Sequence, residues 1–280
     1  MDPARISTTG TGFEERAYEN GVLDPIASYV PGDASTHDRD VQHHRRTSTQ
    51  PSEDAYQRFC NRIARSKTEA DASALLDKHM MKDYDLPYDS IRNATITNTP
   101  NQDSRDFNYG LSDPRPNFLQ GISVQDLPSH LQHHSLHREE PGLAFSHLAV
   151  EFKKRDGNLY QATYQAAYDG AVLVHARERA LAEARARTPD GTAAAAALDR
   201  AAAETAVLTC VTDGQVADVY RHHHRDGQYH QTLVGRESLI FRPRRGRSLI
   251  RNAQDWAWRK AYQLARLMGA NLGDVEEEEE

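Results

Sequence analysis

The sequence predicts a mixed α/β fold in which a central sheet is flanked by helices. Segments with helical periodicity alternate with short apolar runs that indicate strands. Three strand segments precede the longest helix, and further strands and a closing helix follow it. This order is typical of a sheet covered by helices. At 280 residues, the chain is long enough for one large or two small domains.

The composition is polar for a globular protein and suggests solvated segments at the ends of the chain. The chain is 38% hydrophobic and 27% charged, with a mean hydropathy of -0.78. Residues 1–50 are rich in small polar residues, His and Arg and show no sustained periodicity, and the chain ends in a run of Glu. We therefore expect a disordered arm over 1–50, a folded domain over 51–270 and an acidic disordered tail over 271–280.

Several classes of protein are disfavoured by the sequence. Cys60 and Cys210 are too few and too far apart for a disulfide framework or a zinc knuckle. The start lacks the apolar segment of a secretory signal, and no apolar run reaches the roughly 18 residues needed to cross a membrane. We expect an intracellular protein of the nucleus or cytoplasm, which is not secreted and has no membrane partner.

The first half of the chain predicts one helix, two strands and a connection. PSED at 51–54 offers a capping hydroxyl followed by acids, and an apolar stripe continues to about residue 82, which predicts a single helix. Residues 89–100 and 117–123 predict strands. Residues 127–142 predict a surface connection with four histidines, whose spacing matches no standard zinc pattern.

The second half predicts two further helices, four strands and a closing helix. The strongest strand is 143–155, and the Ala-rich segment 158–187 predicts a long helix that ends at TPDG. A short helix at 192–204 follows by propensity. Two Asp-Gly pairs indicate the turns of an antiparallel meander. Its strands are predicted at 206–213, 215–225 and 227–235, and the closing helix at about 247–268.

The segment LAVEFKKRDGNLYQATYQAAYDG, residues 148–170, carries the polar residues with the clearest chemical meaning. Glu151 and Lys153 are two positions apart in a strand, so their side chains share one face. The helix that follows carries Gln161 and Gln165. An acid and an amine on one face could be a structural ion pair, or they could be half of a metal-dependent phosphodiesterase site.

The order of elements and these residues resemble the PD-(D/E)XK nuclease-like superfamily, whose restriction-endonuclease-like core runs α-β-β-β-α-β. Members carry an acid on the first helix, an Asp on the second strand, Glu-x-Lys on the third and often a Gln on the next helix. Glu151-Phe152-Lys153 matches the Glu-x-Lys, and Gln165 or Gln161 matches the helical Gln. PRPNFLQG at 114–121 and the segments around it resemble a branch of this superfamily that is common in fungal proteins of unknown function, over roughly residues 52–268.

The resemblance implies a nuclease that acts on DNA or RNA with Mg²⁺ or Mn²⁺ as cofactor. Glu151 and the acid of the second strand would hold the metal, which activates a water and binds a phosphate oxygen. Lys153 would orient or deprotonate the water and stabilise developing negative charge. Glu69 is the candidate for the helical acid, with a merely solvated position as its alternative. Gln165 would position substrate or water.

The sequence departs from the family pattern at the second-strand acid. Asn117 stands in that place in PRPNFLQG, and its amide oxygen can ligate a metal but brings no charge. Asp113 could supply the carboxylate if the turn through the two prolines carries it to the strand. The departure leaves an alternative function open: a catalytically inactive nuclease-like domain that binds nucleic acid or protein.

The segment FRPRRGRSLIRNAQDWAWRK, residues 241–260, is the candidate nucleic-acid surface. Its arginines could follow a phosphate backbone. The net charge of -7 argues against a protein that coats nucleic acid. Residues 274–280 supply six of those negative charges, however, so a local basic patch is a better guide to nucleic-acid binding than the net charge of the chain. The candidate residues are Arg242, Arg244, Arg245, Arg247 and Arg251.

Overall fold

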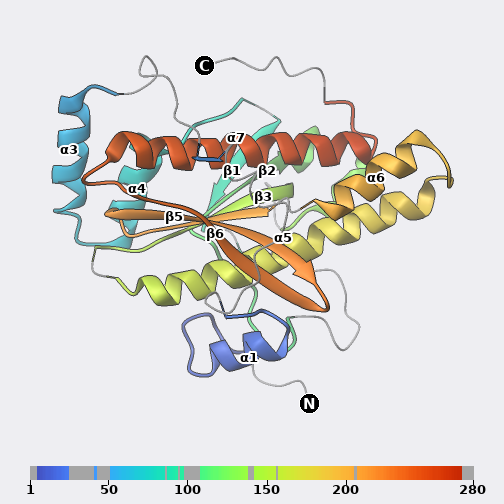
Figure 1. The fold of residues 1–280 in the computed structure, drawn as a ribbon, viewed down its shortest axis with the longest axis horizontal. Helices are drawn as coiled ribbons and strands as arrows, with labels where there is room; N and C mark the ends of the chain where they lie inside the picture. Colours follow the sequence, from blue (N-terminus) through green and yellow to red (C-terminus); the bar gives the residue numbers. More distant parts are fainter. Residues whose placement is uncertain are drawn as a thin grey trace.

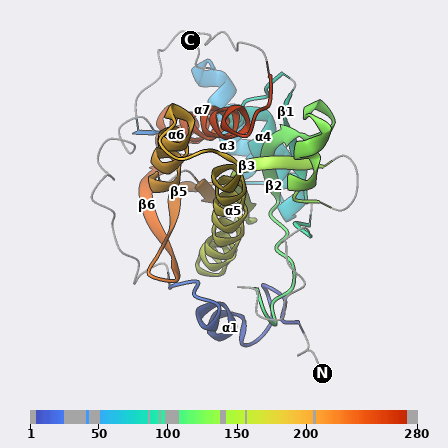
Figure 2. The ribbon, with the colours of Figure 1, turned by 90° about the vertical axis from the view of Figure 1, so that its right-hand side faces the viewer.

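A computed structural model describes residues 5–24, 41–42, 51–85, 87–93, 95–97, 108–137, 142–155, 157–204 and 207–272. Within this part, helices cover both faces of one six-stranded sheet (Figures 1 and 2). The mixed α/β class is therefore confirmed. No helix of the described part combines the length and the apolar character needed to span a membrane.

The sheet is mixed, and its strands follow one another in chain order. β1 to β3 are antiparallel neighbours, β3 and β4 pair in parallel, and β4 to β6 are again antiparallel. The parallel pair requires a crossover, which two helices provide. The strands are β1 (Tyr88–Arg92), β2 (Phe118–Ser123), β3 (Leu143–Phe152), β4 (Val207–Thr212), β5 (Val216–Arg225) and β6 (Gln228–Ser238). The crossover helices are α5 (Leu159–Arg187) and α6 (Ala193–Ala203).

Successive residues of β3 enter two different cores, as expected for a strand that is buried on both faces. Leu148, Val150 and Phe152 pack in the cluster that contains residues of α3 (Glu53–Ile63), α4 (Glu69–Met80) and α7 (Pro243–Leu267). Ala149 packs on the opposite face in the cluster that contains residues of α5. Glu151 follows Ala149 on this second face, so its side chain is directed toward α5.

The single helix predicted over 51–82 is wrong, because the structure has two helices there. The Ser66 hydroxyl donates to the carbonyl of Ile63 at the end of α3, and the Thr68 hydroxyl accepts from Asp71 N to cap α4. A capping hydroxyl favours a new helix start over continuation. The break moves Glu69 from the middle of a helix to the first residue of one.

The other predicted elements are present with small shifts of their ends. β1 ends well before residue 100, because Asn93 adopts a left-handed conformation with φ 53°. Residues 94 and 98–100 lie outside the described residues. α7 begins earlier than predicted, since Pro243 occupies its first turn, where proline is favoured. The predicted connection at 127–142 contains the short helix η3 (Ser129–His134), and a further short helix, η2 (Val124–Asp126), lies between β2 and this connection.

The predicted disordered arm is wrong for residues 5–24, which fold against the domain. This segment contains α1 (Phe13–Glu19), and Phe13, Ala17 and Val22 are buried. The ring of Phe13 meets that of Tyr168 on α5 edge-on, with centroids 5.8 Å apart. These apolar side chains find partners on α5 that sequence periodicity did not reveal. Apart from residues 41–42, the rest of 1–50 lies outside the described residues, as does 273–280 of the predicted tail.

Candidate functional site

The end of β3 holds the predicted pair of an acid and an amine. Glu151 is only 4% exposed. The Lys153 Nζ atom lies 3.5 Å from Glu151 Oε2 and 3.8 Å from Glu69 Oε2. The structure therefore brings together three of the predicted catalytic residues, from β3, the loop that follows it and the start of α4.

Glu69 reaches this group because of its place in α4. It is the first residue of the helix, where a negative side chain interacts favourably with the helix dipole. Its side chain is 42% exposed, so it approaches the Lys153 ammonium from the solvent side.

Asn117 connects Glu69 to the end of β3. The Asn117 Nδ2 atom donates to Glu69 Oε1 at 3.1 Å, and its Oδ1 atom accepts from the Phe152 backbone N–H at 2.6 Å. The amide oxygen that the sequence offered as a metal ligand is therefore directed at the backbone of β3. In this structure, Asn117 positions Glu69.

A second buried acid, Asp169, was missed by the sequence reasoning. It lies on α5, is 1% exposed and shares a hydrogen bond with Glu151. Burial raises the pKa of Glu151 to about 7, with Lys153 acting in the opposite direction. Burial and the neighbouring Glu151 raise the pKa of Asp169 well above its usual range. Burial therefore favours a protonated carboxyl group in this pair.

Gln165 lies one turn before Asp169 on the same face of α5. Its Nε2 atom donates to Thr8 Oγ1 at 3.0 Å. Gln165 Oε1 and Asp169 Oδ2 are buried and have no hydrogen-bond partner among the described residues. Buried oxygens without partners are rare in folded proteins and call for an explanation. The spacing of an amide and an acid at i and i+4 is the sequence signal that could have identified Asp169.

Oxygen atoms dominate this group, which fits a hard divalent cation. Mg²⁺ and Mn²⁺ prefer carboxylate and carbonyl oxygens. Glu151 and Asp169 offer two adjacent carboxyl groups, and a cation would give the unpartnered Asp169 Oδ2 an interaction partner. Glu69 lies against Lys153, and its carboxylate does not join the other two in one group of ligand atoms within 4.8 Å.

Asp113 does not take the place of the missing acid. Its Oδ1 atom pairs with Arg5 NH1 at 3.3 Å. The preceding residues are held by the N-terminal segment, because Ile6 forms a β-bridge with Leu111 and Ser112 N donates to Ile6 O. This pairing turns Asp113 toward Arg5, so the expectation that it joins the Glu151 group finds no contact to support it.

The five predicted nucleic-acid-binding arginines separate into two groups. Arg242, Arg244 and Arg245 are exposed at the start of α7. Arg247 and Arg251 instead donate to backbone carbonyls at the C-terminal end of α4, from His79 to Met81. Arg247 is only 6% exposed. Both guanidinium groups are engaged by these carbonyls, so the structure gives no support to their prediction as phosphate contacts.

Comparison of the chain with protein-family models, curated proteins and solved structures found no match in any of the three. The resemblance to PD-(D/E)XK nucleases therefore stays a prediction, which depends on the residues and their geometry.

Proposed function

We propose that this chain is a metal-dependent phosphodiester hydrolase, a nuclease of the PD-(D/E)XK type that acts on DNA or RNA. The observation that carries the proposal is the convergence of three acids and one amine from separate elements. Buried acids with strongly raised pKa values are more typical of functional sites than of ordinary surfaces. The residues are Glu69, Glu151, Lys153 and Asp169.

The arrangement of elements around the group also supports the proposal. A helix, three antiparallel strands, a crossover helix and a parallel strand follow in the order expected for the restriction-endonuclease-like core. In this chain these are α4, β1, β2, β3, α5 and β4. The acids lie on the first helix, the third strand and the second helix of that order.

Glu151 and Asp169 are the residues that would hold Mg²⁺ or Mn²⁺, and Glu69 would have to move toward them to become a third ligand. Bound there, the ion would supply a water of lowered pKa and charge for a nonbridging phosphate oxygen. A proton held by Glu151 or Asp169 competes with any cation, because a carboxyl group must be deprotonated to ligate. Affinity for the ion should therefore rise with pH as this proton is lost.

Lys153 is placed to stabilise negative charge on a bound phosphodiester. Its side chain is 15% exposed, and its ammonium lies between Glu151 and Glu69. The two acids orient the ammonium, while its partial exposure allows contact with a substrate. A preorganised cation in a water-poor site stabilises developing charge more strongly than one in bulk solvent.

Basic side chains near these elements could contact a phosphate backbone. Lys154 and Arg155 follow Lys153 directly and are exposed. An open hollow of about 480 Å³ between α3 and α4 is lined in part by Arg62, Arg65 and Lys78. Such local clusters favour a polyanion even on a chain of negative net charge.

The test is a cleavage assay with labelled single-stranded DNA, duplex DNA and RNA in Mg²⁺, in Mn²⁺ and in chelator. We expect metal-dependent cleavage that falls about 100-fold or more in Lys153→Gln and Asp169→Asn. Lys260→Gln is the matched control, because it breaks a 2.6 Å ion pair with Glu204 away from the site. Cleavage by this control should equal that of the wild type.

The alternative of an inactive binding module predicts another outcome. Asn117 in place of the family's acid favours it, and Asn117→Asp would restore a carboxylate beside Glu69. Cleavage by Asn117→Asp alone would identify an enzyme that has lost turnover. Nucleic-acid binding measured by fluorescence anisotropy, without cleavage by any variant, would support the binding module and overturn the hydrolase.

A further inference from the structure

A second group of ligating side chains lies on another part of the molecule. The connection before β3 contains η3, where His133 and His134 are adjacent, and Glu183 on α5 lies beside them. The sequence alone offered histidines without a recognisable zinc spacing. The fold supplies the third ligand from a helix that is distant in the sequence.

The three side chains converge on one point. His133 Nε2 and His134 Nε2 lie 3.1 Å and 3.5 Å from the same oxygen, Glu183 Oε2. The ligand atoms all lie within 4.8 Å of one another, and the imidazole rings are 4.1 Å apart. A zinc ion lies about 2.0–2.2 Å from nitrogen and oxygen ligands, which requires ligand atoms roughly 3–3.5 Å apart. Small side-chain rotations achieve that spacing.

The other carboxylate oxygen of Glu183 is held separately. Glu183 Oε1 pairs with Arg187 NH1 at 3.0 Å, one turn further along α5. Oε2 thus remains directed at the two imidazoles. Interactions of this kind orient metal ligands and are a regular part of metal sites.

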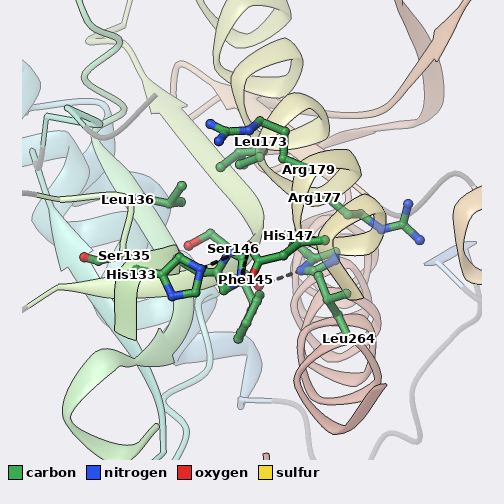
Figure 3. A pocket seen from close by; sticks show the side chains of 14 residues that line it. His133, Ser135, Leu136, Phe145, Ser146, His147, Leu173, Arg177, Arg179 and Leu264 are labelled. Atoms are coloured by element: carbon green, nitrogen blue, oxygen red, sulfur yellow. Dashed lines mark hydrogen bonds and ion pairs between the residues drawn. The ribbon is translucent and has the colours of Figure 1, made fainter. Parts of the chain in front are cut away.

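The group lies at a cavity of about 280 Å³ (Figure 3). His133 and Ser135 of the connection lie on one side of it in the figure, and Arg177 and Arg179 of α5 on another. The wall also includes His147 of β3, which is fully buried. The cavity is large enough for several waters or a small ligand.

His147 is a buried part of the cavity wall and is not itself open to a ligand. Its Nδ1 atom lies 2.6 Å from the Phe145 carbonyl, which can only accept, so Nδ1 carries the hydrogen. Burial lowers the pKa of His147 to about 3, so the ring is neutral at ordinary pH. Because the residue is 0% exposed, the metal ligands of the group are the side chains of η3 and α5 alone.

We propose that His133, His134 and Glu183 form a site for a divalent transition-metal ion of the zinc class. All three residues line the cavity, so a water or a small ligand held there could complete the coordination of the ion. Two imidazoles and one carboxylate suit Zn²⁺ and disfavour Mg²⁺. The site is separate from the Glu151 group, because Glu183 and Asp169 are 14 residues apart on α5, about 21 Å along the helix.

The test is titration of the full chain, first stripped with chelator, with Zn²⁺ by calorimetry and with Co²⁺ by visible absorption. We expect a Zn²⁺ site that persists in Glu151→Gln and is lost or weakened at least about 10-fold in His133→Ala and in Glu183→Gln. Both side chains are partly exposed, so these variants should fold, which circular dichroism checks. His224→Ala is the matched control, because it breaks a 3.0 Å contact between one histidine and Glu178.

Glu151→Gln should leave Zn²⁺ binding unchanged, so that failure of this proposal and failure of the nuclease proposal can be told apart. Zn²⁺ binding weaker than roughly 100 µM would overturn the site. Zn²⁺ binding that is tighter than this limit but persists in both His133→Ala and Glu183→Gln would also overturn the site.

Discussion

The hydrogen bond between Glu151 and Asp169 joins two buried acids, and the overall composition of the chain gives no sign of such a pair. Both acids are almost fully buried, and Lys153 is the cation placed beside them. A carboxyl pair in such surroundings keeps a proton near neutral pH. Burial raises the free-energy cost of ionising these two carboxyl groups in the metal-free protein. A bound cation would offset that cost.

The pair should leave a measurable pH dependence on stability. The folded-state pKa of Glu151 is raised to about 7, so its stabilising effect is present at low pH and is lost as pH rises through that value. Glu151→Gln cannot lose a proton. Relative to the wild type in chelator, it should gain on the order of 2 kcal/mol of unfolding free energy between pH 5 and pH 8. Urea unfolding measures this, and parallel pH profiles would contradict it.

Gly170 allows a close approach of α5 to the sheet. A Cβ at this position would lie 2.2 Å from His222 Nδ1, and His222 is held by Thr209 through a 2.8 Å contact at Nε2. Gly170→Ala gains roughly 1 kcal/mol of helix propensity but costs about 1–3 kcal/mol or more from overpacking. We expect net destabilisation in thermal unfolding. Gly191→Ala, which has open space but φ 75°, tests the separate effect of backbone strain.

Among the elements, α4 is fixed at both ends, and this determines where Glu69 lies. Thr68 caps its start, and Arg247 and Arg251 of α7 bind the carbonyls at its end. Cations at a helix C-terminus interact favourably with its dipole and satisfy carbonyls that lack helical partners. The arginines that the sequence offered to nucleic acid thus hold the helix that carries a candidate catalytic acid.

Removing one of these contacts should loosen α4. Arg251 donates to Met80 O and Met81 O at 3.2 Å and 2.8 Å. Arg251→Gln should lower the unfolding free energy by about 1–3 kcal/mol, because two buried carbonyls lose a charged donor. Arg245→Gln, at an exposed position, should change it by less than about 0.5 kcal/mol. Equal effects of the two substitutions in urea unfolding would contradict this role.

The sequence predicted most elements because their signals are local. Two-residue alternation placed Glu151 and Lys153 on one face, and the long Ala-rich pattern located α5. The break between α3 and α4 was missed because the interruption of the apolar stripe over residues 64–74, with Thr68 as a capping residue inside it, was taken as part of one helix. The contacts of Glu69 and Asn117 depend on α4 packing against β3, which no local pattern encodes.

At the scale of the whole molecule, the N-terminal segment completes the fold. Residues 5–24 bury Phe13 and Val22 against the domain, and Thr8 contacts Gln165 of the candidate site. The polar composition of residues 1–50 concealed this, because only a few apolar residues make the contact.

Deletion of residues 1–24 should therefore destabilise the protein. Each large apolar side chain that loses its buried position costs about 1.5–3 kcal/mol. We expect a lower midpoint of thermal unfolding and increased binding of a hydrophobic dye to the surface uncovered on α5. Phe13→Ala should produce a smaller shift in the same direction. An unchanged midpoint after the deletion would show that the segment contributes nothing to stability.

The parallel pairing of β3 and β4 has a consequence for synthesis on the ribosome. β3 ends at residue 152 and its partner β4 begins at residue 207, so a nascent chain presents β3 with one unpaired edge until the whole crossover has emerged. At roughly 5–20 residues per second, this interval lasts on the order of several seconds. An unpaired apolar strand is a template for association with other chains. The strand that carries the candidate chemistry is thus also exposed to association with other chains during this interval.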